Sequence, residues 1–208
     1  MNRGFFITFE GGDGSGKSTQ IQKLKEYLQS KGMDVILTRE PGGTAISEKI
    51  REIILDPDNA EMSDQTEMML YAAARAQLVN EVIEPVLNSG KSVICDRFVD
   101  SSMAYQAYGR GLGDMVWEVN QKAIGNCMPD LTILLKLDPD QGKNRISNRQ
   151  QDRIEQASSD FHRKVYEGYL ALEQRFPQRI KGIDASRDIE DIFKEIKDMV
   201  DDLMSRTV

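Results

Sequence analysis

The sequence predicts an α/β fold in which a five-stranded parallel sheet carries helices on both faces, and it predicts a single domain over residues 1–208. Two observations lead to this prediction. Short apolar runs alternate with helical patterns along the chain, and that order is typical of parallel strands joined by crossover helices. In addition, the first apolar run leads directly into a glycine-rich segment that opens a helical pattern.

The five predicted strands are short runs rich in apolar residues, with helical patterns between them. They lie in residues 3–10, 35–37, 93–95, 131–137 and 179–183. In an open parallel sheet, ligands bind beyond the carboxyl ends of the strands. The segments that follow these five runs are therefore expected to surround one cleft.

The first predicted helix begins after Lys17. Its apolar side chains Ile21, Leu24 and Leu28 recur at helical spacing, and Gly32 stands where a helix stop is expected. The helix therefore follows the glycine-rich segment without a gap.

Residues 66–80 form a second, long predicted helix, and its pattern is compatible with a bent continuation through Pro85. Packing is the expected role of the apolar residues along one side of this helix. These residues are Met69, Leu70, Ala73 and Ala74.

The composition is that of an ordinary globular domain, with 39% hydrophobic and 29% charged residues. The net charge of −7 argues against a nucleic-acid polymer as partner, although a local group of arginines can hold a phosphate inside an acidic protein. No apolar run approaches the roughly 18 residues of a membrane span, and the first strand begins too early for a signal peptide. Cys95 and Cys127 are too widely spaced for a disulfide framework or a metal motif. We therefore expect a cytoplasmic protein with neither a membrane nor a nucleic-acid partner.

The segment TFEGGDGSGKST matches the phosphate-binding loop G-x-x-x-x-G-K-[ST] from Gly11 to Ser18. Its glycines let the backbone curl so that successive N–H groups point at phosphate oxygens. In such a P-loop, Lys17 reaches the β- and γ-phosphates and the Ser18 hydroxyl binds Mg²⁺. The flanking strand and helix make a chance glycine-rich turn the weaker interpretation. The segment therefore predicts a nucleotide-binding site.

Asp96 and Arg97 directly follow the third predicted strand. P-loop enzymes place at this point the acid that holds magnesium directly or through water, while a helix cap or turn residue is the alternative interpretation of Asp96. Arg97 can donate two hydrogen bonds to one phosphate. Residues 101–106 add hydroxyls, an aromatic ring and an amide, which suit a nucleobase, although a capped surface helix fits their spacing equally well.

Residues 141–161 are polar and arginine-rich between two helical patterns. They form either a solvated connection or a lid over the site.

Over nearly its full length the sequence resembles the bacterial-type thymidylate kinases. The matching segments, in the order of that family, are FEGGDGSGKST, TREPGGT, TEMMLYAAAR, DRFVDSSMAYQ, YGRGLG, PDLTILL, DRIEQ and IDAS. TREPGGT and DR-x-x-x-S-S-x-A-Y-Q are together far more specific than a P-loop alone. The resemblance implies a P-loop fold of the nucleoside monophosphate kinase type with a short mobile lid at residues 141–161. It also implies transfer of the γ-phosphoryl of ATP to dTMP, giving dTDP for dTTP synthesis, and a homodimer packed through helices.

The resemblance assigns roles to individual residues of this chain. ATP would be bound by Gly11, Gly12, Asp13, Gly14, Ser15, Gly16, Lys17, Ser18, Thr19, Arg145, Asp184 and Ala185. dTMP would be bound by Asp13, Arg39, Arg51, Tyr71, Arg75, Arg97, Ser102, Tyr105 and Gln106. Mg²⁺ would be held by Ser18 and Asp96, and catalysis would rest on Lys17, Asp13, Arg97, Arg153 and Arg149.

Within the dTMP set, the implied roles are specific. Asp13 would accept a hydrogen bond from the sugar 3′-hydroxyl, and Arg39, Arg51 and Arg97 would face the monophosphate. Tyr71 would stack on the thymine ring. Arg75 would bond the carbonyl O4, and Gln106 would contact the base edge. Ser102 would lie in the pocket wall, and Tyr105 would crowd any 2′-hydroxyl.

The sequence departs from its relatives at two positions. Gly14 stands where eukaryotic-type enzymes carry an arginine, so the catalytic cation is expected from the lid, where Arg153 is the first candidate and Arg149 and Arg145 are the others. Ala74 stands where some relatives have a serine near the base. Phosphoryl transfer needs no strong general base, so no base is assigned and His162 is interpreted as incidental.

Two other functions fit part of the sequence pattern. A kinase for another nucleoside monophosphate, or for a deoxynucleoside, would share the fold and the P-loop. A P-loop regulatory protein would bind a nucleotide without transferring a phosphoryl group, but the N-K-x-D guanine motif of GTPase switches is absent from the sequence.

Overall fold

The computed structural model describes residues 3–145 and 151–205. Its single sheet has five strands: β1 (Phe6–Glu10), β2 (Val35–Arg39), β3 (Ser92–Asp96), β4 (Leu131–Lys136) and β5 (Ile180–Asp184). The strands lie in the order β2-β3-β1-β4-β5, and each neighbouring pair is parallel. The predicted α/β fold and all five predicted strands are confirmed.

Helical segments connect these strands and cover both faces of the sheet. The α-helices are α1 (Lys17–Ser30), α2 (Ala45–Leu55), α3 (Asp64–Leu78), α4 (Glu84–Asn88), α5 (Val99–Ser102), α6 (Met115–Ile124), α7 (Pro139–Arg145), α8 (Ser159–Arg175) and α9 (Ile189–Ser205). A short 3₁₀ turn, η1 (Pro57–Asn59), and two π-helical segments, η2 (Val79–Ile83) and η3 (Met103–Gly109), complete the set.

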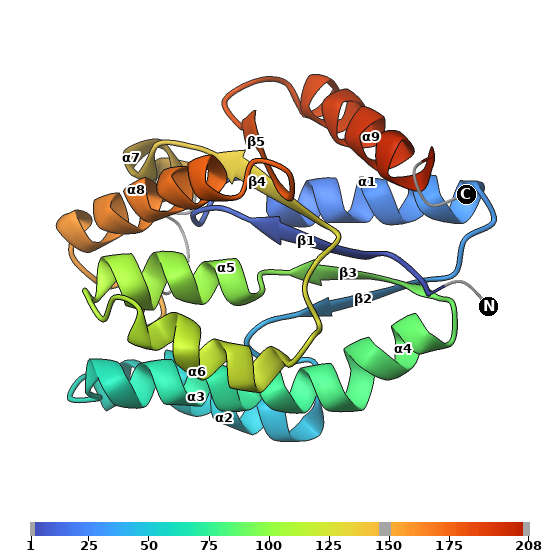
Figure 1. Ribbon diagram of the computed structural model, residues 1–208. Helices are drawn as coiled ribbons and strands as arrows, with labels where there is room; N and C mark the ends of the chain where they lie inside the picture. The colour runs from blue at the N-terminus through green and yellow to red at the C-terminus, as the bar shows by residue number, and fades with distance from the viewer. Residues whose placement is uncertain (1–2, 146–150, 206–208) are drawn as a thin grey trace.

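The helices form a layer on each side of the sheet (Figure 1). On one side α1 and α9 pack on the inner strands through a core that includes Leu24, Ile133 and Ile196. On the other side α4, α5, η3 and α8 cover the sheet, with α2, α3 and α6 outside them. Because all strands are parallel, their carboxyl ends and the loops that follow them meet at one edge of the sheet.

Helix α3 runs without a break through η2 into α4, so the helical path from Asp64 to Asn88 includes Pro85 as the pattern allowed. The predicted apolar side of α3 is wrong at Met69, which is 56% exposed, and at Ala73, which is exposed as well, whereas Ala74 is buried and Leu70 half-buried. The buried side also holds Met68, Ala72 and Leu78 together with Glu67 and Arg75. Two charged residues on the inward face shift that face away from the side that a count of apolar residues selects.

The lid predicted at residues 141–161 falls on several kinds of structure. Residues 141–145 belong to α7, residues 151–158 form turns that lead into α8, and Phe161 lies inside α8. Arg149 lies outside the described residues. The mobility of this segment stays a prediction. In the described part of the chain, no helix has both the length and the apolar character needed to cross a membrane.

Candidate active site

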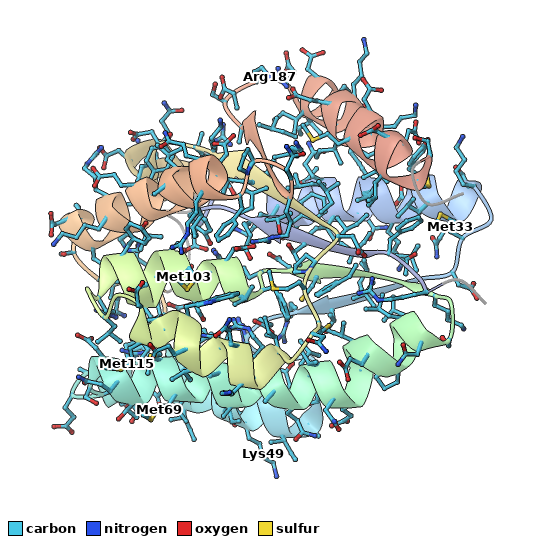
Figure 2. The ribbon with its side chains drawn as sticks, viewed as in Figure 1. Met33, Lys49, Met69, Met103, Met115 and Arg187 are labelled. Carbon is cyan, nitrogen blue, oxygen red and sulfur yellow. The ribbon has the colours of Figure 1, made fainter. Side chains whose placement is uncertain are left out.

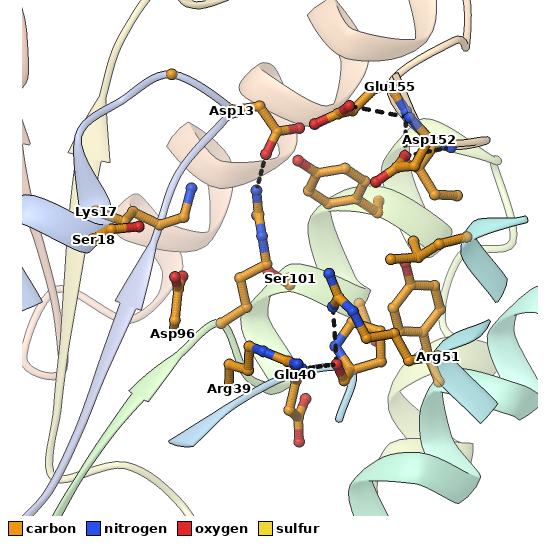
Figure 3. Close-up of a pocket in the computed structure, with 18 of the residues that line it drawn as sticks. Asp13, Lys17, Ser18, Arg39, Glu40, Arg51, Asp96, Ser101, Asp152 and Glu155 are labelled. Atoms are coloured by element: carbon orange, nitrogen blue, oxygen red, sulfur yellow. Dashed lines mark hydrogen bonds and ion pairs between the residues drawn. The ribbon is translucent and has the colours of Figure 1, made fainter. Parts of the chain in front are cut away.

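A cavity of about 770 Å³ opens at the carboxyl ends of the strands. The sequence-predicted residues that line it are Asp13, Gly14, Gly16, Lys17, Ser18, Thr19, Arg39, Arg51, Tyr71, Arg75, Asp96, Arg97, Ser102, Tyr105, Gln106 and Arg145. Figure 3 shows the P-loop side with Lys17 and Ser18 facing the opposite wall with Arg51 across the cavity. The predicted cleft therefore gathers residues that follow β1, β2 and β3.

The P-loop joins β1 to α1 through residues with positive φ. Gly11, Gly14 and Gly16 have φ values of 135°, 75° and 90°, which side chains rarely adopt. A Cβ atom at Gly11 would lie 2.4 Å from the carbonyl oxygen of Leu135 on the neighbouring strand. The glycine spacing in the sequence thus reflects both backbone conformation and the close approach of β4.

Lys17 lies at the start of α1, and its Nζ donates to the carbonyl oxygens of Gly11 (3.1 Å) and Gly12 (3.0 Å). Burial, assisted by the nearby guanidinium of Arg97, lowers the pKa of Lys17 to about 8. The hydrogen-bond acceptors of this buried ammonium are neutral carbonyls, so they do not neutralise its charge. Phosphate oxygens at the P-loop would supply the neutralising charge.

Asp96 and Ser18 provide oxygen ligands that fit Mg²⁺. Asp96 ends β3, and its Oδ1 is buried without a hydrogen-bond partner among the described residues. Ser18 exposes its hydroxyl on the same cavity. Protein Mg²⁺ sites commonly use one or two protein oxygens and complete the octahedron with phosphate and water. The unpaired carboxylate oxygen of Asp96 and the Ser18 hydroxyl, which line one cavity, could serve as these two protein oxygens.

Asp13 and Arg97 join the P-loop to the loop after β3. The Arg97 Nη2 to Asp13 Oδ1 distance is 2.8 Å, and a dashed line marks this ion pair at Asp13 in Figure 3. Burial alone would raise the pKa of Asp13, but the charges of Arg97 and Lys17 hold it below its ordinary value. Arg97 has a φ of 68°, a left-handed conformation that costs energy in a non-glycine residue and often marks a functional position.

Tyr105 is fixed below this pair by aromatic contacts. Its ring centroid lies 6.0 Å from that of Phe161 and 6.2 Å from that of Tyr169, both in edge-to-face geometry. The Arg97 guanidinium lies 5.2 Å from the Tyr105 ring centroid. A ring held from three sides makes a firm steric wall, as its predicted role next to the sugar requires.

Glu10, the last residue of β1, is fully buried and was not among the predicted site residues. Its carboxylate accepts hydrogen bonds from the Phe98 N–H (2.8 Å), the Ser101 hydroxyl (2.6 Å) and the Tyr169 hydroxyl (2.9 Å). Burial and then the neighbouring charge of Asp100 raise the pKa of Glu10 to about 7. A carboxylate in an otherwise apolar strand immediately before the P-loop was the available signal.

The raised pKa of Glu10 predicts a pH-dependent stability. The folded protein binds this proton more tightly than the unfolded chain, so the contribution is present below the unfolded pKa and is lost as pH rises through about 7. Between pH 5 and pH 8, we expect wild type to lose on the order of 2 kcal/mol of unfolding free energy relative to Glu10→Gln. Urea unfolding at both pH values measures this change. The replacement Glu118→Gln, at an exposed position, is the control and should run parallel to wild type.

Arg39 and Arg51 form a cationic patch on the wall opposite the P-loop. Both donate to the carbonyl oxygen of Pro41, at 3.1 Å and 2.9 Å. Arg39 also pairs with Glu48 at 3.0 Å. Two guanidinium groups that converge on one carbonyl create a positive field suited to a phosphate.

Arg75 lines the same wall but is only 1% exposed. Each of its three nitrogens already donates to the protein, and the acceptors are Glu40, Ser102, Asn120 and the carbonyl of Phe98. The guanidinium is therefore held rigidly at the cavity wall. A base carbonyl could bond to it only by sharing or replacing one of these acceptors.

The described lid arginines differ in their contacts. Arg145 lines the cavity and donates to the carbonyls of Gly14 (3.3 Å) and Ala185 (3.4 Å). Arg153 is not among the lining residues; its side chain is 9% exposed, and its nitrogens donate to the Ile54 carbonyl (2.7 Å) and the Glu67 carboxylate (2.7 Å). As a transition-state cation Arg153 would have to leave Glu67, and its role stays a prediction.

The remaining predicted ATP residues lie near the cavity without lining it. Gly11, Gly12 and Ser15 form the back of the P-loop, and Ala185 reaches the site through its bond from Arg145. Asp184 lines a separate cavity of about 300 Å³ beside Lys136 and Ser186. Its contact with the nucleoside part of ATP stays a prediction.

A P-loop after β1, an acid at the end of β3 and an arginine patch that begins at the end of β2 form the arrangement of a phosphotransferase. The chain belongs to the thymidylate kinase family, whose pattern it matches over residues 9–196. It is 49% identical to a thymidylate kinase of Oceanobacillus iheyensis, over 97% of this chain and 92% of that protein. A thymidylate kinase of Geobacillus sp. (strain WCH70) is 51% identical, over 92% of this chain and 93% of that protein.

A solved structure supports the same assignment. The crystal structure of thymidylate kinase from Ehrlichia chaffeensis has a TM-score of 0.78 and 32% sequence identity, covering 96% of this chain and 99% of that one. The family predicted from the motifs is confirmed.

Proposed function

We propose that this protein transfers the γ-phosphoryl group of ATP to dTMP, giving dTDP and ADP. Membership of the thymidylate kinase family carries the dTMP kinase activity with it. The observation that supports it within this chain is one cavity with a P-loop on one wall and converging arginines on the other. The Asp13–Arg97 ion pair, with atoms 2.8 Å apart, links those two walls where donor and acceptor phosphates would meet.

The P-loop wall is the proposed ATP side. Backbone N–H groups of residues 11–19 and the Lys17 ammonium bind the β- and γ-phosphates, which replace the carbonyls that Lys17 contacts in this structure. Ser18 and Asp96 hold Mg²⁺. When bound, Mg²⁺ neutralises charge on the phosphate oxygens. Arg145, Asp184 and Ala185 lie toward the nucleoside of ATP.

The opposite wall is the proposed dTMP side. Arg39, Arg51 and Arg97 bind the monophosphate, and Asp13 accepts the 3′-hydroxyl proton in a hydrogen bond. The base pocket comprises Tyr71, Arg75, Ser102, Tyr105 and Gln106. Because Tyr105 is wedged between two aromatic rings and Arg97, it excludes a 2′-hydroxyl by volume.

Charge that develops during transfer needs a further cation, since Gly14 offers none. We assign that cation to the lid, with Arg153 and Arg149 as the catalytic candidates and Arg145 nearer to ATP. Arginine suits the task because its planar fork can bond two phosphate oxygens at once.

A coupled assay of ADP formation tests the proposed function. Initial rates with ATP and Mg²⁺ are measured for dTMP, dUMP, dCMP and thymidine under one set of conditions. We expect dTMP to have the highest kcat/KM. If another acceptor is turned over as fast or faster, that acceptor is the substrate. If none of the four acceptors increases ADP formation, the protein is better described as a nucleotide-binding regulator.

We also propose a homodimer formed through α2, α3 and α6, in a protein that works in the cytoplasm. Large apolar side chains are exposed on these helices: Ile46 (52%), Ile53 (48%), Met69 (56%) and Met115 (45%). Figure 2 labels Met69 and Met115 on α3 and α6, two helices that pack against each other. An apolar group on adjacent helices is the kind of surface that a partner copy would cover.

Replacing Met69 with aspartate should convert the dimer into monomer, because it places a charge at the centre of this apolar group. Sedimentation velocity at micromolar protein measures the change. Ile189→Asp, at a residue of α9 that is 51% exposed, is the matched control and should stay dimeric. If wild type sediments as a monomer, the dimer is excluded; if only Ile189→Asp dissociates, the interface is elsewhere.

A further inference from the structure

Glu67 of α3 is a fully buried carboxylate that lies behind the base pocket. It accepts hydrogen bonds from Gln106 Nε2 (2.9 Å), Arg110 Nη2 (2.9 Å) and Arg153 Nη2 (2.7 Å). Burial opposes its ionisation, but the hydrogen bonds and charge of these partners hold the pKa of Glu67 below its ordinary value. An ionised carboxylate has acceptors only.

The ionised state of Glu67 fixes the orientation of the Gln106 side-chain amide. The amide must turn its NH₂ group to Glu67, because the opposite orientation would place its oxygen against a buried negative charge. Gln106 is 1% exposed and lines the cavity next to Ser102 and Tyr105. Within residues 3–145 and 151–205, no group donates a hydrogen bond to Gln106 Oε1. One N–H and the carbonyl oxygen of this amide are thus left for a ligand.

This donor and acceptor pair distinguishes two classes of pyrimidine. A 4-oxo pyrimidine such as thymine presents an acceptor, O4, next to a donor, N3–H. A 4-amino pyrimidine such as cytosine presents a donor, the amino group, next to an acceptor, N3. An amide free to rotate by 180° would bond either edge equally well, so a glutamine alone does not select between them.

We propose that Glu67 is a positioning residue that makes the site select 4-oxo over 4-amino pyrimidines, because it locks the Gln106 amide in one orientation. Glu67 is not among the residues that line the cavity, so its proposed effect on the base is exerted through Gln106. The inference rests on the proposed function, since it takes Gln106 as the contact to the base edge.

The contacts of Arg75 leave this task to Gln106. All three nitrogens of Arg75 donate to protein acceptors, and a guanidinium has no acceptor of its own. Arg75 therefore offers nothing to the N3–H of thymine. Gln106 Oε1 is a cavity-lining acceptor whose orientation the protein itself has fixed.

The test is the effect of Glu67→Gln on the ratio of the dCMP and dTMP dissociation constants, measured by calorimetry without ATP. A glutamine at position 67 can turn either a donor or an acceptor to Gln106, so both amide orientations become available. We expect the ratio to fall by about tenfold or more, since one misoriented buried hydrogen bond costs about that much. dCMP affinity should rise in absolute terms, which a general loosening of the pocket would not produce.

The matched control is Arg110→Gln, which removes another partner of the same carboxylate, 2.9 Å away, and leaves Glu67 in place. The control should keep the wild-type ratio. If Glu67→Gln does not fold, the double variant Glu67→Gln with Arg153→Gln, which also removes one of the two guanidinium groups that lose their carboxylate partner, is measured instead.

The outcomes separate this inference from the function on which it rests. If the wild-type protein binds dCMP as tightly as dTMP, the proposed function is wrong. Wild type that prefers dTMP, with a folded Glu67 variant that keeps the same ratio, would overturn the inference alone. An equal fall of the ratio in Arg110→Gln would overturn it too, because the effect would then come from packing around Glu67.

Discussion

Replacing Arg145, Arg149 and Arg153 together with alanine should lower kcat by about 10³-fold or more. Phosphoryl transfer depends on charge neutralisation, and a well-placed arginine contributes roughly 10³ to 10⁵ in rate. Gly14 leaves the P-loop without its own arginine, so we expect the lid to supply this cation. Single-turnover kinetics with saturating ATP and dTMP measure the effect. A triple variant with near-normal kcat would show that the lid mechanism is wrong.

The single replacements identify which lid arginine acts. If Arg153 is the cation, Arg153→Ala should lower kcat about a hundredfold or more and leave dTMP affinity and the melting temperature nearly unchanged. If its bonds to Glu67 and to the Ile54 carbonyl, both 2.7 Å, are what matter, the melting temperature and dTMP affinity fall instead. Arg153→Lys should rescue the first role only partly. A normal kcat in Arg153→Ala with a large loss in Arg149→Ala would move the role to Arg149.

Arg97→Ala should lower kcat/KM for dTMP by about 10² to 10³-fold, with a much smaller effect on the KM for ATP. The Arg97–Asp13 pair is partly buried, and losing Arg97 also removes the predicted contact to the acceptor phosphate, so the expected cost is about 3 to 4 kcal/mol. Arg97 bonds Asp13 at 2.8 Å and is also anchored by the Tyr169 hydroxyl at 3.2 Å. Steady-state kinetics with each substrate varied in turn provide the measurement.

Arg39→Ala is the matched control for Arg97→Ala, because it removes a guanidinium from the same cavity. The Arg39 side chain is 47% exposed, so solvent screens its charge and its loss should cost roughly tenfold or less. Equal losses in the two variants would mean that burial of Arg97 adds nothing to phosphate binding.

The sheet and the P-loop could be predicted because both are written in local sequence patterns. An apolar run such as residues 131–137 predicts a buried strand from its own composition. Gly11 and Gly16 need positive φ whatever the remainder of the chain does. These features depend on few residues that are close in sequence, so one sequence was enough to find them.

The buried carboxylates could not be predicted because their partners lie far away in the chain. Glu10 bonds the Tyr169 hydroxyl across a separation of 159 residues, and Glu67 bonds Arg153 across 86. A glutamate without its partners is a residue that belongs on the surface. For the same reason the predicted buried face of α3 was in part wrong, because Glu67 and Arg75 face inward and Met69 faces outward.

The P-loop and α7 meet at Gly14 and Gly142. At each of these positions the backbone of the other segment leaves no room for a side chain. A Cβ at Gly14 would lie 2.4 Å from the Gly142 carbonyl oxygen, and a Cβ at Gly142 would lie 2.3 Å from the Asp13 carbonyl oxygen. Gly14 also has a φ of 75°. We therefore expect the two positions to be epistatic in evolution, with an arginine at position 14 tolerated only where α7 has moved away. A change of the catalytic cation from the lid to position 14 would then pass through poorly active intermediates. A library that varies position 14 together with residues 139–145 should contain active variants with an arginine at position 14, which the single substitution would not give.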